Sequence, residues 1–208
     1  MGKSEFQWLS WSRKLYAIAQ NGLVFAEDPY DADRYEQIRS IAADIVSVHS
    51  NMELDYIRAI FSEESGYATP KVDVRAVVIK QGTILLVKEK SDGLWSLPGG
   101  WADVNDAPSE AITREILEES GYRTKAVRLL ALYDRDKHGH PPFPFHVYKL
   151  FFECEILSGK PQTSIETDAV DFFDPLELPP LSTTRVTAGQ ILRLFELCGD
   201  QASPTDFD

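Results

Sequence analysis

The chain has 208 residues, a formal net charge of −12 and an isoelectric point near 4.8. This acidic balance argues against a protein that wraps long nucleic acid, because such proteins present a basic surface to the phosphate backbone. Hydrophobic residues make up 43% of the chain, yet no apolar run approaches the roughly 18 residues of a membrane span, so no membrane partner is expected.

The two cysteines, Cys154 and Cys198, lie far apart and form no C-x-x-C pair. The sequence therefore indicates neither a disulfide framework nor a zinc site. We expect a reducing, cytoplasmic location.

Residues 1–65 are expected to form a small helical N-terminal domain. Apolar residues recur there every three to four positions in three successive stretches, which is typical of amphipathic helices. The stretches cover residues 8–19, 35–48 and 54–61. A unit of this size has a marginal core, so we expect it to pack on the following domain or on a second copy of the chain, as in a homodimer. Residues 66–70 are interpreted as a linker.

From residue 71 the pattern changes to strands. Residues 72–78 are largely apolar with polar interruptions, and a Gln-Gly turn leads into the apolar residues 83–87, which predicts a β-hairpin. Arg75 lies within the first strand, where an unpaired charge would be costly. It either pairs with a structural carboxylate or points into a pocket and binds a substrate phosphate; the sequence leaves both open.

Residues 99–122 hold the densest cluster of acids. Glu115, Glu118 and Glu119 share one face of a helix, because each residue advances the helix by about 100°. Carboxylates at this spacing repel one another, so they indicate either a bound divalent cation or a solvated acidic face. A glycine pair before the helix lets the backbone approach a ligand, and Gly121 is expected to end the helix.

The rest of the chain predicts further strands and one helix. Strands are expected at residues 125–133, 145–156 and 170–173, a helix at 187–198, and a flexible tail at 201–208. This order predicts a mixed sheet between helices. The second domain is therefore placed at residues 71–200.

The loop of residues 134–145 is expected to be a wall of a substrate pocket, the alternative being a surface turn. Its cations are candidates for phosphate contacts, and its aromatic residues are candidates for stacking on a base. The candidates are Arg135, Lys137 and His138 for phosphate, and Phe143 or Phe145 for the base.

A longer pattern runs from the glycine pair through the acidic helix. Its matching residues are Gly100, Arg114, Glu115, Ile116, Glu118, Glu119, Gly121 and Tyr122. They fit the Nudix box, G-x5-E-x7-R-E-U-x-E-E-x-G-U, where U is a bulky apolar residue. Asp106 stands at the first glutamate of the box. It can contact Arg114 or a metal, or cap the helix, and we favour the cap.

Residues 70–198 thus resemble the Nudix hydrolase family. The resemblance implies an α+β protein, with a Nudix α/β/α sandwich and mixed sheet preceded here by a small all-α domain. It also implies two or three Mg²⁺ or Mn²⁺ ions and hydrolysis of a nucleoside diphosphate linked to a group X. By position Glu166 is an extra metal-facing glutamate, unless it is a surface acid.

The roles that the resemblance implies can be stated by residue. The metal ligands would be Gly100 through its carbonyl, Glu115, Glu118, Glu119 and Glu166. Glu118, Glu119 and Glu166 would carry catalysis. Arg114 would contact the carboxylate ligands, not the metal, and would orient them.

Across nearly the whole chain the sequence resembles the group of CDP-choline and ADP-ribose pyrophosphatases that have an N-terminal helical domain. Hydrolysis of CDP-choline to CMP and phosphocholine is the preferred expectation from the sequence. ADP-ribose, giving AMP and ribose 5-phosphate, is the first alternative. A Nudix domain that senses a ligand without hydrolysing it is an alternative of another class.

Overall fold

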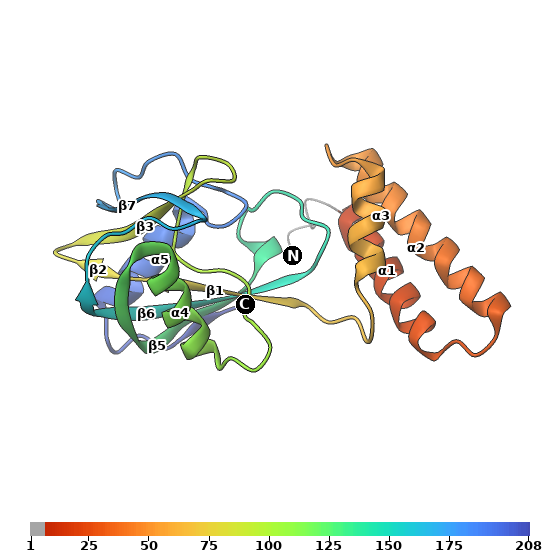
Figure 1. Ribbon diagram of the computed structural model, residues 1–208, viewed down its shortest axis with the longest axis horizontal. Helices are drawn as coiled ribbons and strands as arrows, with labels where there is room; N and C mark the ends of the chain where they lie inside the picture. Colours follow the sequence, from red (N-terminus) through yellow and green to blue (C-terminus); the bar gives the residue numbers. More distant parts are fainter. Residues whose placement is uncertain (1–6) are drawn as a thin grey trace. The chain divides into compact units, whose positions relative to one another are not determined.

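The computed structural model describes residues 7–208 and divides into two compact units. One unit comprises the chain up to Pro70 together with Pro142–His146, and the other comprises Lys71–Pro141 and Val147–Asp208 (Figure 1). We call them the helical unit and the catalytic unit. The first six residues of the expected helical domain lie outside the described residues. The sequence had assigned residues 142–146 to the second domain, whereas the structure places them in the helical unit.

The helical unit contains the three expected helices. They are α1 (Gln7–Phe25), α2 (Pro29–His49) and α3 (Leu54–Glu63). Asp28 caps α2 by accepting a hydrogen bond from the Tyr30 N–H at 2.9 Å, and Pro29 opens the helix. In the described part of the chain no helix has the length and apolarity to cross a membrane.

Aromatic rings dominate the core of the helical unit. Tyr16 of α1 stacks on Phe61 of α3 with ring centroids 4.1 Å apart, and Phe145 packs 6.0 Å from Phe61. Arg13 donates hydrogen bonds to the carbonyl oxygens of Phe143 at 2.6 Å and Pro144 at 3.2 Å. The segment of residues 142–146 therefore completes this core although it is distant in sequence.

One face of α1 remains uncovered. Trp11 and Ile18 are each 56% exposed and Phe25 is 72% exposed. These residues are seven apart, so they lie in one stripe along the helix. An exposed stripe of large apolar side chains marks an interaction surface.

The catalytic unit contains two four-stranded sheets. The first has the order β1-β6-β5-β8, in which β1 is parallel to β6 and β5 is antiparallel to β6. The second has the order β2-β3-β4, with β7 also paired to β3. The bounds are β1 (Lys71–Val77), β2 (Ile79–Lys80), β3 (Thr83–Glu89), β4 (Trp95–Ser96), β5 (Tyr122–Asp134), β6 (Val147–Gly159), β7 (Thr167–Phe173) and β8 (Asp206–Phe207).

Helices cover both faces of these strands. Helix α4 (Pro108–Ser120) inserts Ile112 and Ile116 into one hydrophobic core, and α5 (Ala188–Gly199) inserts Ile191 and Leu194 into another. Strand β3 serves both cores, because successive side chains of a strand point to opposite faces. The expected fold class, a mixed α/β unit preceded by a helical one, is confirmed.

The C-terminal tail is bonded to the sheet. Strand β8 pairs in parallel with β5, and Asp206 accepts hydrogen bonds from Tyr133 Oη at 3.0 Å and Arg193 Nε at 2.8 Å. The expectation of a flexible tail is therefore wrong for its last residues. Sequence periodicity could not detect a strand of two residues.

Candidate active site

A glycine loop runs between β4 and α4 and lies against β1. The Val74 N–H donates to the Gly100 carbonyl at 2.8 Å, and the Ala76 N–H donates to the Pro98 carbonyl at 2.8 Å. Gly99 has φ 137°, and a Cβ there would stand 2.0 Å from the Val74 oxygen. Only glycine can follow this path, because a side chain would collide with the strand.

The loop delivers its backbone to the carboxylates of α4. The Gly99 N–H donates to Glu119 Oε2 at 2.8 Å. At Gly100 a Cβ would lie 3.0 Å from Glu115 Oε2, so the missing side chain makes room for that carboxylate. Loop and helix therefore bring Gly100, Glu115 and Glu119 together, as the box spacing predicted.

The three helix carboxylates differ in burial. Glu119 is 4% exposed, the Glu115 side chain is 12% exposed and the Glu118 side chain is 58% exposed. Burial raises the pKa of Glu119 to about 8, and the negative charges of Glu89 and Glu115 add to the rise. Burial also raises the pKa of Glu115. A divalent cation would relieve this repulsion.

Arg114 lies among four carboxylates. Its Nη1 is 2.9 Å from Glu115 Oε1 and 3.3 Å from Glu118 Oε2. Its Nη2 is 2.9 Å from Asp103 Oδ2, and its Nε is 3.2 Å from Asp106 Oδ2. The guanidinium can thus hold Glu115 and Glu118 in fixed orientations.

The expected cap at Asp106 is wrong. Pro108 is the first residue of α4, so Ala107 occupies the N-cap position. Asp106 instead accepts a hydrogen bond from Arg114, which was the other interpretation of this residue. The shorter acid therefore still reaches the arginine of the box.

Arg75 is engaged by a structural carboxylate. Its Nη2 is 2.9 Å from Asp73 Oδ1, and its Nη1 donates to the Leu97 carbonyl at 3.1 Å. Lys149 of β6 pairs with the other oxygen of Asp73. All three side chains of this ion network are buried. We therefore retain the structural interpretation of Arg75 in place of phosphate binding, and note that it anchors the strand leading to the glycine loop.

Glu166 is exposed in the turn before β7. Its carbonyl accepts a hydrogen bond from the Lys90 N–H at 2.9 Å. The next residue, Thr167, donates from Oγ1 to the Glu119 carbonyl at 2.8 Å. The turn is thus fixed to both β3 and α4, which brings Glu166 near the box.

A pocket of about 400 Å³ lies beside this turn. Its lining residues are Glu89, Lys90, Ser91, Ile165, Glu166 and Arg185. Glu89 and Arg185 were missed by the sequence interpretation, which named neither as a site residue. Strand β3 extends to Glu89, and this carboxylate is buried two residues after the buried Val87. An acid that continues the inward alternation of a strand was the available signal.

The loop candidates do not form one site. Arg135 is buried and donates to the Pro141 carbonyl at 2.8 Å, whereas Lys137 is exposed. His138 stacks on Tyr133 with centroids 3.9 Å apart, and its Nε2 is 3.2 Å from Asp208 Oδ1. Arg135 therefore has a structural role, and His138 contacts the tail.

Phe143 and Phe145 belong to the helical unit. Their rings meet edge to face with centroids 6.0 Å apart, and Phe145 is packed into the core of that unit. Phe145 thus packs against the core of the helical unit, and stacking of Phe143 or Phe145 on a base stays a prediction.

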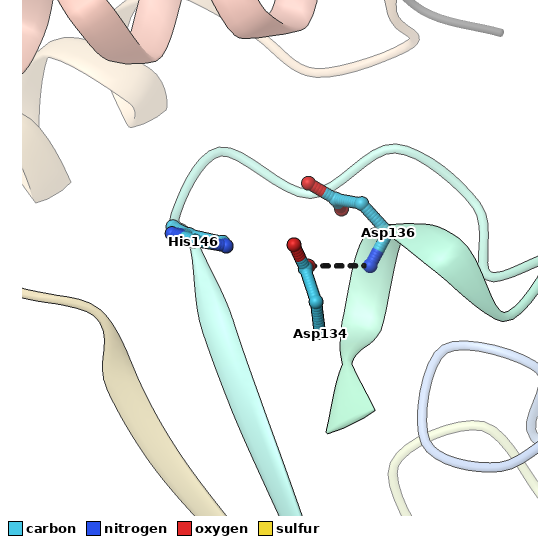
Figure 2. Close-up of side chains that lie close together, drawn as sticks. All are labelled: Asp134, Asp136 and His146. Atoms are coloured by element: carbon cyan, nitrogen blue, oxygen red, sulfur yellow. Dashed lines mark hydrogen bonds between the residues drawn. The ribbon is translucent and has the colours of Figure 1, made fainter. Parts of the chain in front are cut away.

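At the start of the loop of residues 134–145, an acidic side chain bonds to the backbone. Figure 2 shows Asp134 and Asp136, where the Asp136 N–H donates to Asp134 Oδ1 at 3.1 Å. His146, also drawn there, belongs to the helical unit. A second pocket, about 390 Å³ in volume, includes Tyr133, His138 and Arg193 in its lining. Its lining includes neither a box carboxylate nor Glu166, the extra glutamate that the resemblance implies, so we do not place the chemistry there.

The donor set of the box fits a divalent cation. Carboxylates and a backbone carbonyl are the hard oxygen donors that Mg²⁺ and Mn²⁺ prefer. Glu115, Glu119 and the Gly100 carbonyl supply such donors within one loop and one helix. The residues present therefore match the metal that the resemblance implies.

Comparison with known proteins agrees with this geometry. A family model described as "UDP-X-like, N-terminal oligomerisation domain" matches residues 6–61, and the NUDIX domain model matches residues 69–195. The Bacillus subtilis (strain 168) protein named "Putative ADP-ribose pyrophosphatase YjhB" is 43% identical over 208 residues, which is 100% of both chains.

Solved structures give the same result. An ADP-ribose pyrophosphatase from Streptococcus suis 89-1591 is 40% identical with a TM-score of 0.63, and the match covers 67% of this chain and 100% of that one. A UDP-X diphosphatase is 32% identical with a TM-score of 0.64, and the match covers 100% of both chains. The NUDIX domain model matches more than half of this chain. The chain therefore belongs to the Nudix family and is a Nudix pyrophosphatase.

Proposed function

We propose that this enzyme hydrolyses the diphosphate bond of a nucleoside diphosphate linked to X, with ADP-ribose as the first candidate substrate. The observation that carries the proposal is the seating of Glu119 and Glu115 against the Gly99-Gly100 backbone. The full-length relative from Bacillus subtilis, named for ADP-ribose, supports the choice of substrate. Attack of water on one phosphorus would release AMP and ribose 5-phosphate.

The proposed metal ligands are the Gly100 carbonyl, Glu115, Glu118, Glu119 and Glu166. Two or three Mg²⁺ or Mn²⁺ ions would withdraw negative charge from the phosphate oxygens and lower the pKa of water. The backbone of Gly99 holds the Glu119 carboxylate in place, and Arg114 holds Glu115 and Glu118. Such fixed charges are effective because they need no rearrangement as the transition state forms.

Glu118 and Glu166 are proposed to handle the proton of the attacking water. Both side chains are exposed, so water and substrate can reach them. Glu119 is enclosed and bonded to the loop, which suits a ligand better than a mobile base. Of the phosphate-binding candidates, Lys137 is exposed and is retained.

CDP-choline, which the sequence resemblance favoured, becomes the second candidate. Its support is the helical unit that precedes the hydrolase. The full-length relatives carry the names of ADP-ribose and UDP-X activities, so these substrates take precedence. A ligand sensor without turnover is less compatible with a full set of helix carboxylates.

We further propose a homodimer formed through the helical unit. The uncovered stripe of Trp11, Ile18 and Phe25 offers an apolar contact, and the matched family description names an oligomerisation domain.

The test is a hydrolysis assay with Mg²⁺ or Mn²⁺ on ADP-ribose, CDP-choline and a UDP-sugar, with products identified by mass. We expect ADP-ribose to give AMP and ribose 5-phosphate with the highest kcat/KM. Preference for CDP-choline with release of CMP would restore the sequence-based expectation. Tight binding of any of the three without turnover would favour the sensor.

A further inference from the structure

Glu89 is a buried acid that the box does not include. It is the last residue of β3 and is 6% exposed. Its Oε1 lies 3.2 Å from Nε of Arg185, and within residues 7–208 its Oε2 accepts no hydrogen bond. Glu89 lines the pocket of about 400 Å³ described above, so a cation or water can reach this carboxylate.

Arg185 is itself rigidly held. Its Nη1 is 3.1 Å from Asp92 Oδ2 and donates to Ser182 Oγ at 2.9 Å, while its Nη2 donates to Ser91 Oγ at 3.0 Å. Ser182 Oγ also donates to Asp92 Oδ2 at 2.7 Å. With these contacts on its outer nitrogens, the guanidinium keeps only Nε for Glu89. It therefore fixes the direction of the Glu89 carboxylate.

Glu89 lies near two of the proposed metal ligands, because its charge acts on Glu119 and it shares a pocket with Glu166. Glu89 and Glu166 line the same pocket, and the β-ladder pairs Glu89 with Thr167. Thr167 in turn bonds the Glu119 backbone. Glu89 at the end of β3 and Glu166 in the turn before β7 thus line one pocket next to the buried end of α4.

We propose that Glu89 is an additional carboxylate of the divalent-cation site, and that Arg185 is the positioning residue that holds it. This inference rests on the proposed function, because it assigns one more residue to the same metal centre. Glu89 would bind a cation from the β3 side, opposite the ligands on α4.

The test measures Mn²⁺ binding to the full chain without substrate, by electron paramagnetic resonance. We expect the weakest Mn²⁺ site of E89Q to have a dissociation constant at least about tenfold higher than that of the unmodified protein. E153Q is the matched control, because Glu153 is a half-buried glutamate that is likewise paired with an arginine, with its Oε2 2.7 Å from Arg128 Nε. E153Q should bind Mn²⁺ like the unmodified protein.

A second pair of variants leaves Glu89 unchanged and replaces Arg185, the residue that holds it. R185Q should weaken Mn²⁺ binding and raise the Mn²⁺ concentration that half-activates hydrolysis, and R185K should restore part of both. Mn²⁺ binding by E89Q and R185Q equal to that of E153Q would overturn the inference and leave the proposed function intact. Absence of Mn²⁺ binding in the unmodified protein and in E153Q would instead overturn the proposed metal centre.

Discussion

The helical unit and the catalytic unit place their polar and apolar groups in opposite ways. In the described part of the helical unit the buried polar residues are neutral, Ser12 and Gln20, while large apolar side chains remain exposed on α1. The catalytic unit buries many ionisable side chains: Asp73, Arg75, Glu89, Glu119, Arg135, His140 and Lys149.

This difference shows which groups lower the folding stability of each unit. Burying a charged side chain costs desolvation free energy. Such groups cluster at functional sites, where fixed charges stabilise the reacting groups. Leaving apolar surface exposed is a cost that association recovers. The following changes test this division of labour, beginning with the largest expected effect.

Replacing Glu119 by Gln should lower kcat by about 10²-fold or more, because the amide cannot offer a charged ligand. It should also stabilise the metal-free protein at pH 8. The folded-state pKa of about 8 means that ionising this buried acid destabilises the protein increasingly above its unfolded pKa near 4.5. Hydrolysis rates and thermal unfolding with a chelator measure both effects.

The control for this change is E155Q, at an exposed position of β6. It should behave like the unmodified enzyme in both measurements. Full activity of E119Q would contradict the assignment of the buried charge to catalysis.

Replacing Asp73 by Asn should destabilise the catalytic unit by about 3–5 kcal/mol, because Arg75 and Lys149 would lose their shared buried anion. Although burial alone would raise it, the two cations hold the pKa of Asp73 below its usual value. Urea unfolding at pH 7 measures the loss. The matched change D31N breaks an exposed pair with Arg34 on α2 and should cost under about 1 kcal/mol. Equal losses would remove the distinction between the units.

His140 should make the catalytic unit sensitive to acid. Burial lowers the pKa of His140 to about 4. Its contribution is complete above the unfolded pKa near 6.5 and is lost as pH falls towards 4, about 3 kcal/mol in all. H140Q should remove that share of the pH dependence when unfolding is followed between pH 7 and pH 4. An unchanged pH profile in H140Q would show that the burial of His140 is not the cause.

Replacing Trp11, Ile18 and Phe25 together by Ser should weaken self-association about tenfold or more, because the stripe supplies the apolar contact. Light scattering across a dilution series measures it. The control replaces Val104 and Leu176, which are 89% and 82% exposed on the catalytic unit, by Ser. If both sets changed association equally, the helical unit would have no special role in it.

Local patterns predicted the parts of the site that depend on local geometry. The box spacing placed Glu115 and Glu119 on one face, and Gly121 ends α4 in the left-handed conformation with φ 75°, as expected. The local rule failed at Asp106, where Pro108 moved the helix start by one residue.

The rest depends on pairings that local periodicity does not encode. Lys149 meets Asp73 from 76 residues away, because β1 and β6 align in register. The role of Glu89 depends on the pairing of β3 with β7, and the docking of β8 on β5 involves two residues only. Each of these contacts is created by register between distant strands.

The segment of residues 142–146 has a consequence for how the protein can be divided. Because Phe145 completes the core around Tyr16 and Phe61, the helical unit is not one continuous piece of chain. A truncation after Pro70 would leave the helices without that ring, and the remaining fragment would carry an unburied phenylalanine. The two units are therefore poor interchangeable modules: a recombination boundary at the linker would separate them in sequence and still cut through one of their cores.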